Sequence, residues 1–426
     1  MRNIEHYNIG EGVNFTYIPD SKFKTTLISV AMFLPIIESD VSVNAVLPNL
    51  LVHSCEQYPS LVSITKRLEE LYGASISPSV QKIGDMQVVG IFAQGIDGKF
   101  TSDGVDNILE LTKLVCNVIF EPNVKNEAFI KENIDLEKRQ LKEEILAIMN
   151  DKKDFARKRC LEIMCKSEKF GIDTLGTLEG ADKITGELAF NAWKNLLSSS
   201  RIEITMIGSG PCERVVGEFK KKFSGIRLQN VCEYSSEIKS AKSNVEEVVE
   251  RKNVSQCKLV LGLRAKDVEQ EINYPAMKIM NAILGGTPQS KLFVNVREKL
   301  SLCYYCSSRY IKQKAIMFIE SGVEQKNIEQ AKDQILEQLK DIRLGNFSDK
   351  DFDETKLYIT QGLKKISDSL LSLNSWYLTQ CIEKSQKSVD EHIDEVNSVT
   401  REQIIAAANQ IELDTIYILS GEGSEQ

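Results

Sequence analysis

The feature that most constrains this chain is a repeated order of predicted elements in its two halves. Each half begins with an apolar strand pattern, at 25–34 and 256–263, and continues with two helical patterns. Two alternating segments typical of a hairpin come next, at 74–93 and 303–321, followed by long amphipathic helical patterns. Because the order and the spacing agree, the sequence predicts an internal duplication.

The closing elements of the two halves also agree. Thr185 and Thr400 each begin a helix, and the strand that follows each helix ends at a glycine. We therefore expect an α+β fold of two homologous domains, each a largely antiparallel β-sheet packed with α-helices. The predicted helices lie at 43–55, 61–71, 105–119 and 129–165 in the first half, and at 274–284, 290–300, 328–344 and 351–373 in the second.

A stretch rich in Ser, Lys and Glu separates the two halves. A chain of 426 residues is too long for one ordinary hydrophobic core. We predict an N-terminal domain at 1–231, a linker at 232–251 and a C-terminal domain at 252–426.

The charge and hydropathy pattern excludes several classes of partner. The 53 Lys and Arg residues are outnumbered by 61 Asp and Glu residues, so no overall positive field favours nucleic acid. No run of eighteen apolar residues occurs, which predicts no membrane span. The first residues also lack the pattern of a signal peptide, so the expected location is the cytoplasm.

The ten cysteines are expected to be reduced residues of the core. Cys303 and Cys306 form a C-x-x-C pattern, but they fall in a predicted strand. Residues three apart in a regular strand face opposite sides, so we expect these two thiols not to meet.

The three histidines, His6, His53 and His392, are far apart in sequence. The segment from His53 to Gln57 resembles an H-x-x-E-H zinc helix, with Glu56 at the place of the water-activating residue. Gln57 stands where the second histidine is needed, and glutamine is a poor zinc ligand. This segment therefore predicts a damaged site at best.

A specific run of motifs lies in the second half. Leu284-Gly-Gly286 is followed by Ser290-Lys-Leu-Phe293 and then by Arg297-Glu-Lys-Leu-Ser-Leu-Cys-Tyr304. This run and the duplicated architecture resemble the pitrilysin or insulinase-like peptidases, the inverzincins, and especially the small two-domain branch that includes mitochondrial processing peptidase. The one clear departure is Ser301, where the family usually has glycine.

The resemblance implies roles for individual residues. Arg297 and Tyr304 would be the substrate-binding residues, which hold the backbone of a peptide. The family's H-x-x-E-H falls over Ala45–Asn49, where no zinc ligand remains, and Glu144 lies at the place of the third ligand. The resemblance thus implies no catalytic residue and no metal site in this chain.

These implications lead to one favoured hypothesis, a non-catalytic, substrate-binding subunit of a heterodimeric zinc-dependent processing peptidase. Its partners would be a zinc-bearing homologous subunit and a peptide or unfolded segment, with the zinc held by the partner subunit. One alternative is an active zinc metallopeptidase that uses His53, Glu56 and a third group such as Glu144. The other is a scaffold pseudo-enzyme without a peptide substrate.

Overall fold

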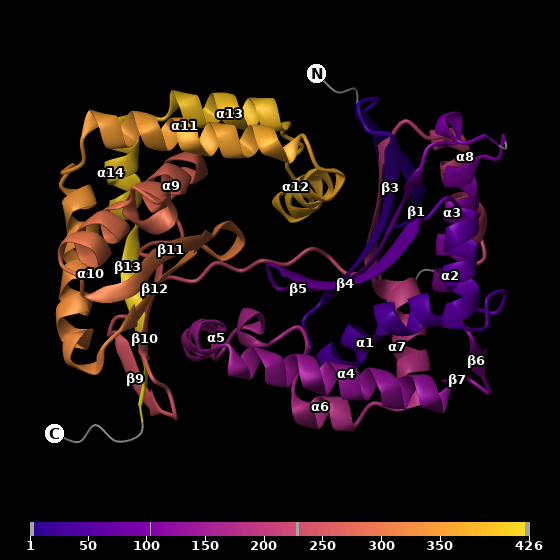
Figure 1. The fold of residues 1–426 in the computed structure, drawn as a ribbon, viewed down its shortest axis with the longest axis horizontal. Helices are drawn as coiled ribbons and strands as arrows, with labels where there is room; N and C mark the ends of the chain where they lie inside the picture. The colour runs from indigo at the N-terminus through magenta and orange to yellow at the C-terminus, as the bar shows by residue number, and fades with distance from the viewer. Residues whose placement is uncertain (1–3, 103, 227–229, 422–426) are drawn as a thin grey trace. The chain divides into compact units, whose positions relative to one another are not determined.

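The structure, a computed structural model, describes residues 4–102, 104–226 and 230–421. These residues form two compact units, each with its own β-sheet (Figure 1). Neither unit is continuous in sequence, because each takes one segment from the opposite half of the chain. Unit 1 comprises Met1–Ile145, Ile172–Ser236 and Asp368–Gln386, and unit 2 comprises Leu146–Gly171, Glu237–Ser367 and Lys387–Gln426.

The sheet of unit 1 has the strand order β1-β2-β8-β3-β5-β4. All neighbouring strands are antiparallel except β2 and β8, which run parallel. The central strands β3 and β5 are buried on both faces, which explains their long apolar runs. The strands are β1 (Glu5–Gly10), β2 (Val13–Pro19), β3 (Thr25–Pro35), β4 (Ser75–Ile83), β5 (Met86–Ile96) and β8 (Arg201–Gly208), with a separate pair β6 (Val124–Lys125) and β7 (Ala128–Phe129).

The sheet of unit 2 repeats this topology. Its order β11-β12-β10-β13-β9 matches β4-β5-β3-β8-β2 of unit 1, and its parallel pair, β9 and β13, occupies the equivalent place. The predicted duplication and the predicted α+β class are therefore confirmed. The strands are β9 (Glu246–Arg251), β10 (Cys257–Ala265), β11 (Cys303–Ile311), β12 (Ile316–Val323) and β13 (Ile411–Ser420).

The helices begin where the sequence provides capping side chains. Thr185 accepts a hydrogen bond from the backbone of Leu188, and Thr400 forms a full capping box with Gln403, as the sequence predicts. The helices of unit 1 are α1 (Val41–His53), α2 (Leu61–Glu70), α3 (Asn107–Phe120), α4 (Lys131–Asn150, in unit 1 up to Ile145), α6 (Leu178–Asp182), α7 (Gly186–Ser199), α8 (Cys212–Phe223) and α12 (Leu370–Glu383), with the 3₁₀ turn η1 (Gly98–Phe100).

The helices of unit 2 include two π-helical segments, η3 and η4. Segment η3 begins inside the helix predicted at 274–284 and extends two residues beyond it, and η4 lies inside the helix predicted at 290–300. The unit contains α5 (Lys152–Met164), α9 (Tyr274–Asn281), η3 (Ala282–Gly286), η4 (Leu292–Lys299), α10 (Ile328–Arg343), α11 (Asp349–Ile366), α13 (Val389–Ser398) and α14 (Arg401–Asn409), with the 3₁₀ turns η2 (Lys169–Gly171), η5 (Lys312–Lys314) and η6 (Gln325–Asn327).

The segment predicted as one helix at 129–165 is two helices in the structure. Asp151 separates α4 from α5, and its side chain caps α5 by accepting hydrogen bonds from the backbone of Lys153 and Asp154. The break lets α5 join unit 2, where it packs on β10 and β13. Gly262 of β10 allows this close approach, since a Cβ there would lie 2.8 Å from the sulfur of Met164.

Residues 368–386, from the second half of the chain, likewise pack in unit 1. Helix α12 packs on β3 and β8, and its Leu378 joins a buried cluster with Phe33 and Val88. Each sheet therefore has one face covered by a helix from the opposite half of the chain.

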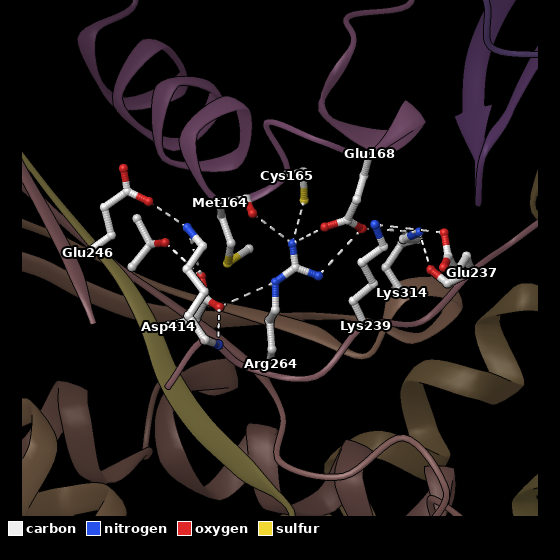
Figure 2. Close-up of polar contacts among 11 residues, drawn as sticks. Met164, Cys165, Glu168, Glu237, Lys239, Glu246, Arg264, Lys314 and Asp414 are labelled. Carbon is white, nitrogen blue, oxygen red and sulfur yellow. Dashed lines mark hydrogen bonds and ion pairs between the residues drawn. The ribbon is translucent and has the colours of Figure 1, made fainter. Parts of the chain in front are cut away.

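A buried group of charged side chains holds the segment around α5 on the sheet of unit 2 (Figure 2). Arg264 of β10 is 2% exposed, pairs with Glu168, and lies 3.6 Å from Asp414 of β13. Its guanidinium also donates to the carbonyl of Met164 at 2.9 Å. Lys314 lies 3.5 Å from Glu168. Two cations thus face two anions, and the buried charges compensate one another.

The domain limits predicted at 231 and 252 stay a prediction, because the packing units exchange segments. Within the predicted linker, residues 246–251 form β9, which pairs with β13. Among the helices of the described residues, none combines the length and the apolarity needed to cross a membrane.

Candidate functional site

One cavity of unit 2 brings together the two side chains that the family resemblance assigns to peptide binding. Arg297 and Tyr304 both line this cavity, whose volume is ≈ 390 Å³. We call it the clamp cavity. The other lining residues are Glu298, Ser301, Leu302, Cys303, Glu324 and Asn327, and most of these are polar or charged. The structure therefore places the two predicted residues side by side, while their role in binding stays a prediction.

The backbone between Arg297 and Tyr304 takes two uncommon conformations. Arg297 lies on η4, a π-helix, which is a rare form that is frequent at functional sites. Ser301 then adopts a left-handed conformation with a φ of 51°, which glycine adopts at a lower cost than serine. Ser301 is the position at which the family usually has glycine. The departure from the family pattern therefore leaves the turn itself in place.

A β-bulge directs Tyr304 into the clamp cavity. Cys303 pairs with Val323 and Tyr305 pairs with Gly322, so Tyr304 is the extra residue of β11. Tyr304 is 60% exposed. Tyr305 instead lies against Gly322, where an added Cβ would come within 2.5 Å of its ring. Of the two neighbouring tyrosines, only Tyr304 lines the cavity.

The guanidinium group of Arg297 has donors available for a ligand. It lies over the ring of Phe293, 4.6 Å from the ring centroid, and its Nε is 3.6 Å from a carboxylate oxygen of Glu298. Both charged side chains are more than one-third exposed, so this ion pair is weak. A guanidinium carries five N–H donors, and Arg297 can therefore donate to the carbonyl oxygens of a bound chain.

Gly285, the first glycine of the pair Gly285-Gly286, lies where η3 packs closely on β11. A Cβ at Gly285 would lie 2.6 Å from the backbone nitrogen of Ser308 in β11. The Ser308 hydroxyl donates to the carbonyl of Asn281 at 3.0 Å across the same contact. Gly285 thus lets η3 pack directly on the strand that carries Tyr304.

The bulge also shows that the prediction for Cys303 and Cys306 is wrong. Both cysteines lie on the buried face of β11, with exposed fractions of 8% and 4%. The extra residue at Tyr304 shifts the alternation, so Cys303 lies opposite Val323 and Cys306 lies opposite Ser321. Their side chains therefore lie on the same face of β11, and all ten cysteines of the chain are free thiols.

Helix α1 carries the residues that the family resemblance places at the zinc motif. These residues are Ala45–Asn49, whose side chains are apolar except that of Asn49. Side chains of Ala, Val, Leu and Pro carry no atom that binds a metal, so these residues do not fit zinc. The described residues contain no group of three or more His, Cys, Asp or Glu residues that could hold a metal ion.

The residues of the alternative zinc site are therefore not assembled. His53 is the last residue of α1, and Glu56 is exposed in the link that follows. Glu144 is exposed on α4. The carboxylate of α4 that meets α1 is Glu137, whose Oε1 lies 3.2 Å from Nδ1 of His53.

Glu137 is a functional candidate that the sequence analysis missed. It is 1% exposed, and burial raises its pKa to about 7 against the opposing effect of a hydrogen bond from Asn49. Burial also lowers the pKa of His53. Apart from these two neighbours, the described residues offer neither Glu137 oxygen a hydrogen bond. Glu144 lies about two helical turns further along on a similar face, so the sequence alone could not choose between the two glutamates.

Comparisons with known proteins agree with this distribution of residues. Residues 183–358 match the family model described as the Peptidase M16 inactive domain, a range that includes Arg297 and Tyr304. The probable inactive metalloprotease YmfF of Bacillus subtilis is 28% identical over 410 residues, which cover 96% of each chain. The chain resembles the inactive M16 peptidases. This finding confirms the resemblance to the pitrilysin-like branch that lacks the zinc motif.

Two further relatives extend the comparison. The uncharacterized zinc protease YmxG of Bacillus subtilis is 21% identical over 291 residues, which cover 67% of this chain and 69% of YmxG. The chain also matches the crystal structure of a conserved protein from Enterococcus faecalis V583, with a TM-score of 0.92 and 26% identity. This match covers 100% of each chain. The fold of this chain therefore matches a solved structure over its whole length, and the chain is similar to relatives named as a probable inactive metalloprotease and as a zinc protease.

Proposed function

We propose that this chain is the peptide-binding subunit of a two-protein peptidase, in which a homologous zinc-bearing subunit supplies the metal-dependent step. The substrate would be a peptide or an unfolded segment in an extended conformation. The observation that carries the proposal is that Arg297 and Tyr304 line the same cavity. The family resemblance supports it, because it places the zinc motif over Ala45–Asn49, which offer no zinc ligand.

The position of β11 supports peptide binding. Among the described strands, β11 is at the edge of its sheet, so one row of its backbone groups has no strand partner. An extended peptide can use such an edge for main-chain hydrogen bonds. Arg297 would then donate to peptide carbonyl groups, and the exposed phenol of Tyr304 would donate to an oxygen that gains negative charge during hydrolysis.

The relatives support the division of labour. Bacillus subtilis contains both YmfF, named as probably inactive, and YmxG, named as a zinc protease. By analogy, the partner of this chain would be a YmxG-like protein. The proposal places the pair in the cytoplasm, where the free thiols of this chain would persist.

The test is reconstitution with a zinc-bearing homologue, followed by measurement of peptide cleavage and peptide affinity. We expect hydrolysis by the mixture and none by this chain alone. Tyr304→Phe should lower turnover by about 10²–10³ without impairing assembly, because it removes one donor to the developing oxyanion. Arg297→Ala should weaken peptide binding as well as turnover, because its donors also act on the bound substrate.

Tyr305→Phe is the matched control, since it removes the same hydroxyl group from a side chain outside the clamp cavity. It should leave both measurements unchanged. Full activity of the Arg297 and Tyr304 variants in an assembled pair would instead favour the scaffold hypothesis. Cleavage by this chain alone that depends on His53 would favour the active-peptidase alternative.

A further inference from the structure

Cys303 and Cys306 lie at the two ends of the bulge that presents Tyr304. Their partners on β12, Val323 and Ser321, are two positions apart in a regular strand. Two strand positions span about 6–7 Å, so the Cα atoms of the two cysteines lie near the upper end of the range that a disulfide bridges. Both side chains lie on the same, buried face of β11. A disulfide between them therefore needs only a small movement of the backbone.

The two thiols differ in their access to small molecules. Cys303 lines the clamp cavity, whereas Cys306 does not and is 4% exposed. A small oxidant that enters the cavity therefore reaches Cys303 first. Cys306 lies directly behind it, in the position of a resolving thiol.

The surroundings of Cys303 favour its thiolate. Hydrogen bonds from Cys306 and Ser321 and the charge of Arg297 lower the pKa of Cys303 to about 7, against the opposing effect of burial. Burial is the largest effect at two other cysteines, and raises the pKa of Cys116 and of Cys165 to about 12. Since the thiolate is the reactive form, Cys303 is distinguished from the ordinary core cysteines of this chain.

We propose that Cys303 and Cys306 are a redox-active dithiol, which hydrogen peroxide or an organic peroxide converts to a disulfide that brackets Tyr304. The Cys303 thiolate attacks one peroxide oxygen, and the O–O bond breaks to leave a sulfenic acid on Cys303 and hydroxide from hydrogen peroxide, or an alkoxide from an organic peroxide. The Cys306 thiol then attacks the sulfenic sulfur, and the S–S bond forms with release of water. The dithiol loses two electrons and the peroxide gains two, and a thiol reductant reverses the change.

The disulfide would act on the clamp cavity. Closing it draws the two ends of the bulge together and shifts Tyr304, and it removes the thiolate that faces Arg297. The oxidised chain should therefore bind peptide about two- to tenfold more weakly, the equivalent of about one hydrogen bond. This consequence rests on the proposed function, whereas the formation of the disulfide does not.

Disulfide formation can be tested on the full-length wild-type protein. The reduced protein is titrated with hydrogen peroxide, the remaining thiols are alkylated, and the chain is cut with chymotrypsin. Cleavage after Tyr304 or Tyr305 separates the two cysteines, so a disulfide is seen as two fragments that stay joined until a reductant is added. We expect this link at peroxide concentrations that leave Cys116 and Cys160 reduced.

Variants identify the order of the two steps. In Cys306→Ser, peroxide should leave a sulfenic acid on Cys303 that dimedone traps. Cys257→Ser, which removes a buried cysteine of the neighbouring strand β10, should leave the disulfide intact. If the fragments containing Cys303 and Cys306 stay separate in the wild-type protein while other cysteines oxidise, the proposal is overturned.

The effect on the clamp cavity is measured as peptide affinity of the reduced, the oxidised and the re-reduced protein. A loss on oxidation that returns on reduction supports the coupling. If the reduced protein binds peptide and oxidation changes nothing, the coupling is wrong although the disulfide forms. If the reduced protein binds no peptide, the proposed function fails, and the dithiol is judged by the fragment mapping alone.

Discussion

Replacing Glu137 by Gln should stabilise unit 1 at neutral and alkaline pH, and should do so less as the pH falls. Glu137 is 1% exposed, and apart from His53 and Asn49 no described residue offers its carboxylate an ion pair or a hydrogen bond. A carboxylate in such a place loses its hydration without full compensation. Gln has nearly the same size and carries no charge, so the substitution removes this cost and keeps the packing.

The magnitude follows from the pKa of Glu137, which burial raises from 4.5 to about 7. Between these values the folded chain binds more protons than the unfolded chain, so the contribution of Glu137 to stability falls as the pH rises through this window. It is fully present below pH 4.5 and lost above pH 7. At about 1.4 kcal/mol per pH unit, the wild type should lose about 3 kcal/mol relative to the Gln variant across the window.

His53 titrates in the opposite sense. Burial lowers its pKa, so the folded chain binds fewer protons at His53 than the unfolded chain below pH 6.5. This effect is present in both proteins, but its size differs between them, because the substitution removes a carboxylate 3.2 Å from the imidazole of His53. The quantity to compare is the difference in free energy of unfolding between the Gln variant and the wild type, measured at pH 4.5 and at pH 8. Effects of the substitution that do not depend on pH cancel when the two values are subtracted.

The assay is urea unfolding followed by tryptophan fluorescence. The two tryptophans of the chain, Trp193 and Trp376, both belong to unit 1, so their emission reports on the unit that contains Glu137. Glu144→Gln is the control and should change the free energy of unfolding by less than about 0.5 kcal/mol at every pH, because Glu144 is exposed. A stability difference between Glu137→Gln and wild type that is the same at pH 4.5 and pH 8 would refute the reasoning.

Three further predictions concern the turn, the buried charges and the metal. Ser301→Gly should raise the free energy of unfolding by about 0.5–1 kcal/mol, because Ser301 has a φ of 51°. Ser367→Gly, at a φ of −66°, should lower it, and urea unfolding followed by circular dichroism measures both changes. Glu168→Gln should destabilise unit 2 by about 3 kcal/mol in the same assay, because it leaves Arg264 and Lys314 with one fewer buried anion. Glu162→Gln, which removes a more exposed carboxylate, should have little effect. The purified chain should hold no stoichiometric zinc by elemental analysis, and His53→Ala should not alter that result; a tightly bound zinc that is lost in this variant would restore the active-peptidase alternative.

The sequence predicted the fold well because the duplicated fold depends on period and order, which are local properties of the chain. The strands, the caps at Thr185 and Thr400, and the equivalence of the two halves all follow from such patterns. The exchange of α5 and α12 between the units was missed. The transfer of α5 depends on one break at Asp151, whose side chain caps α5.

The errors at the site have a similar origin. The bulge at Tyr304 adds one residue to β11, and this single addition reverses the side on which Cys303 lies relative to Cys306. No composition signal marks such a bulge, because the pairing of β11 with β12 decides it. Glu137 was missed because the choice between Glu137 and Glu144 depends on how α4 is rotated against α1, a tertiary property.

The second half of the chain carries the clamp residues Arg297 and Tyr304, whereas the first half has apolar residues at Ala45–Pro48 and a buried carboxyl group at Glu137. Apolar residues at Ala45–Pro48 avoid leaving unpaired metal ligands inside unit 1, since buried polar groups without partners cost free energy. Glu137 differs from these residues, because it is a buried carboxyl group whose ionisation costs free energy. If Glu137→Gln stabilises unit 1 and the assembled pair keeps its full turnover, the carboxylate has no role in the activity. If turnover falls while the chain becomes more stable, Glu137 is retained for the activity of the pair, because a stabilising change that lowers activity identifies a functional residue.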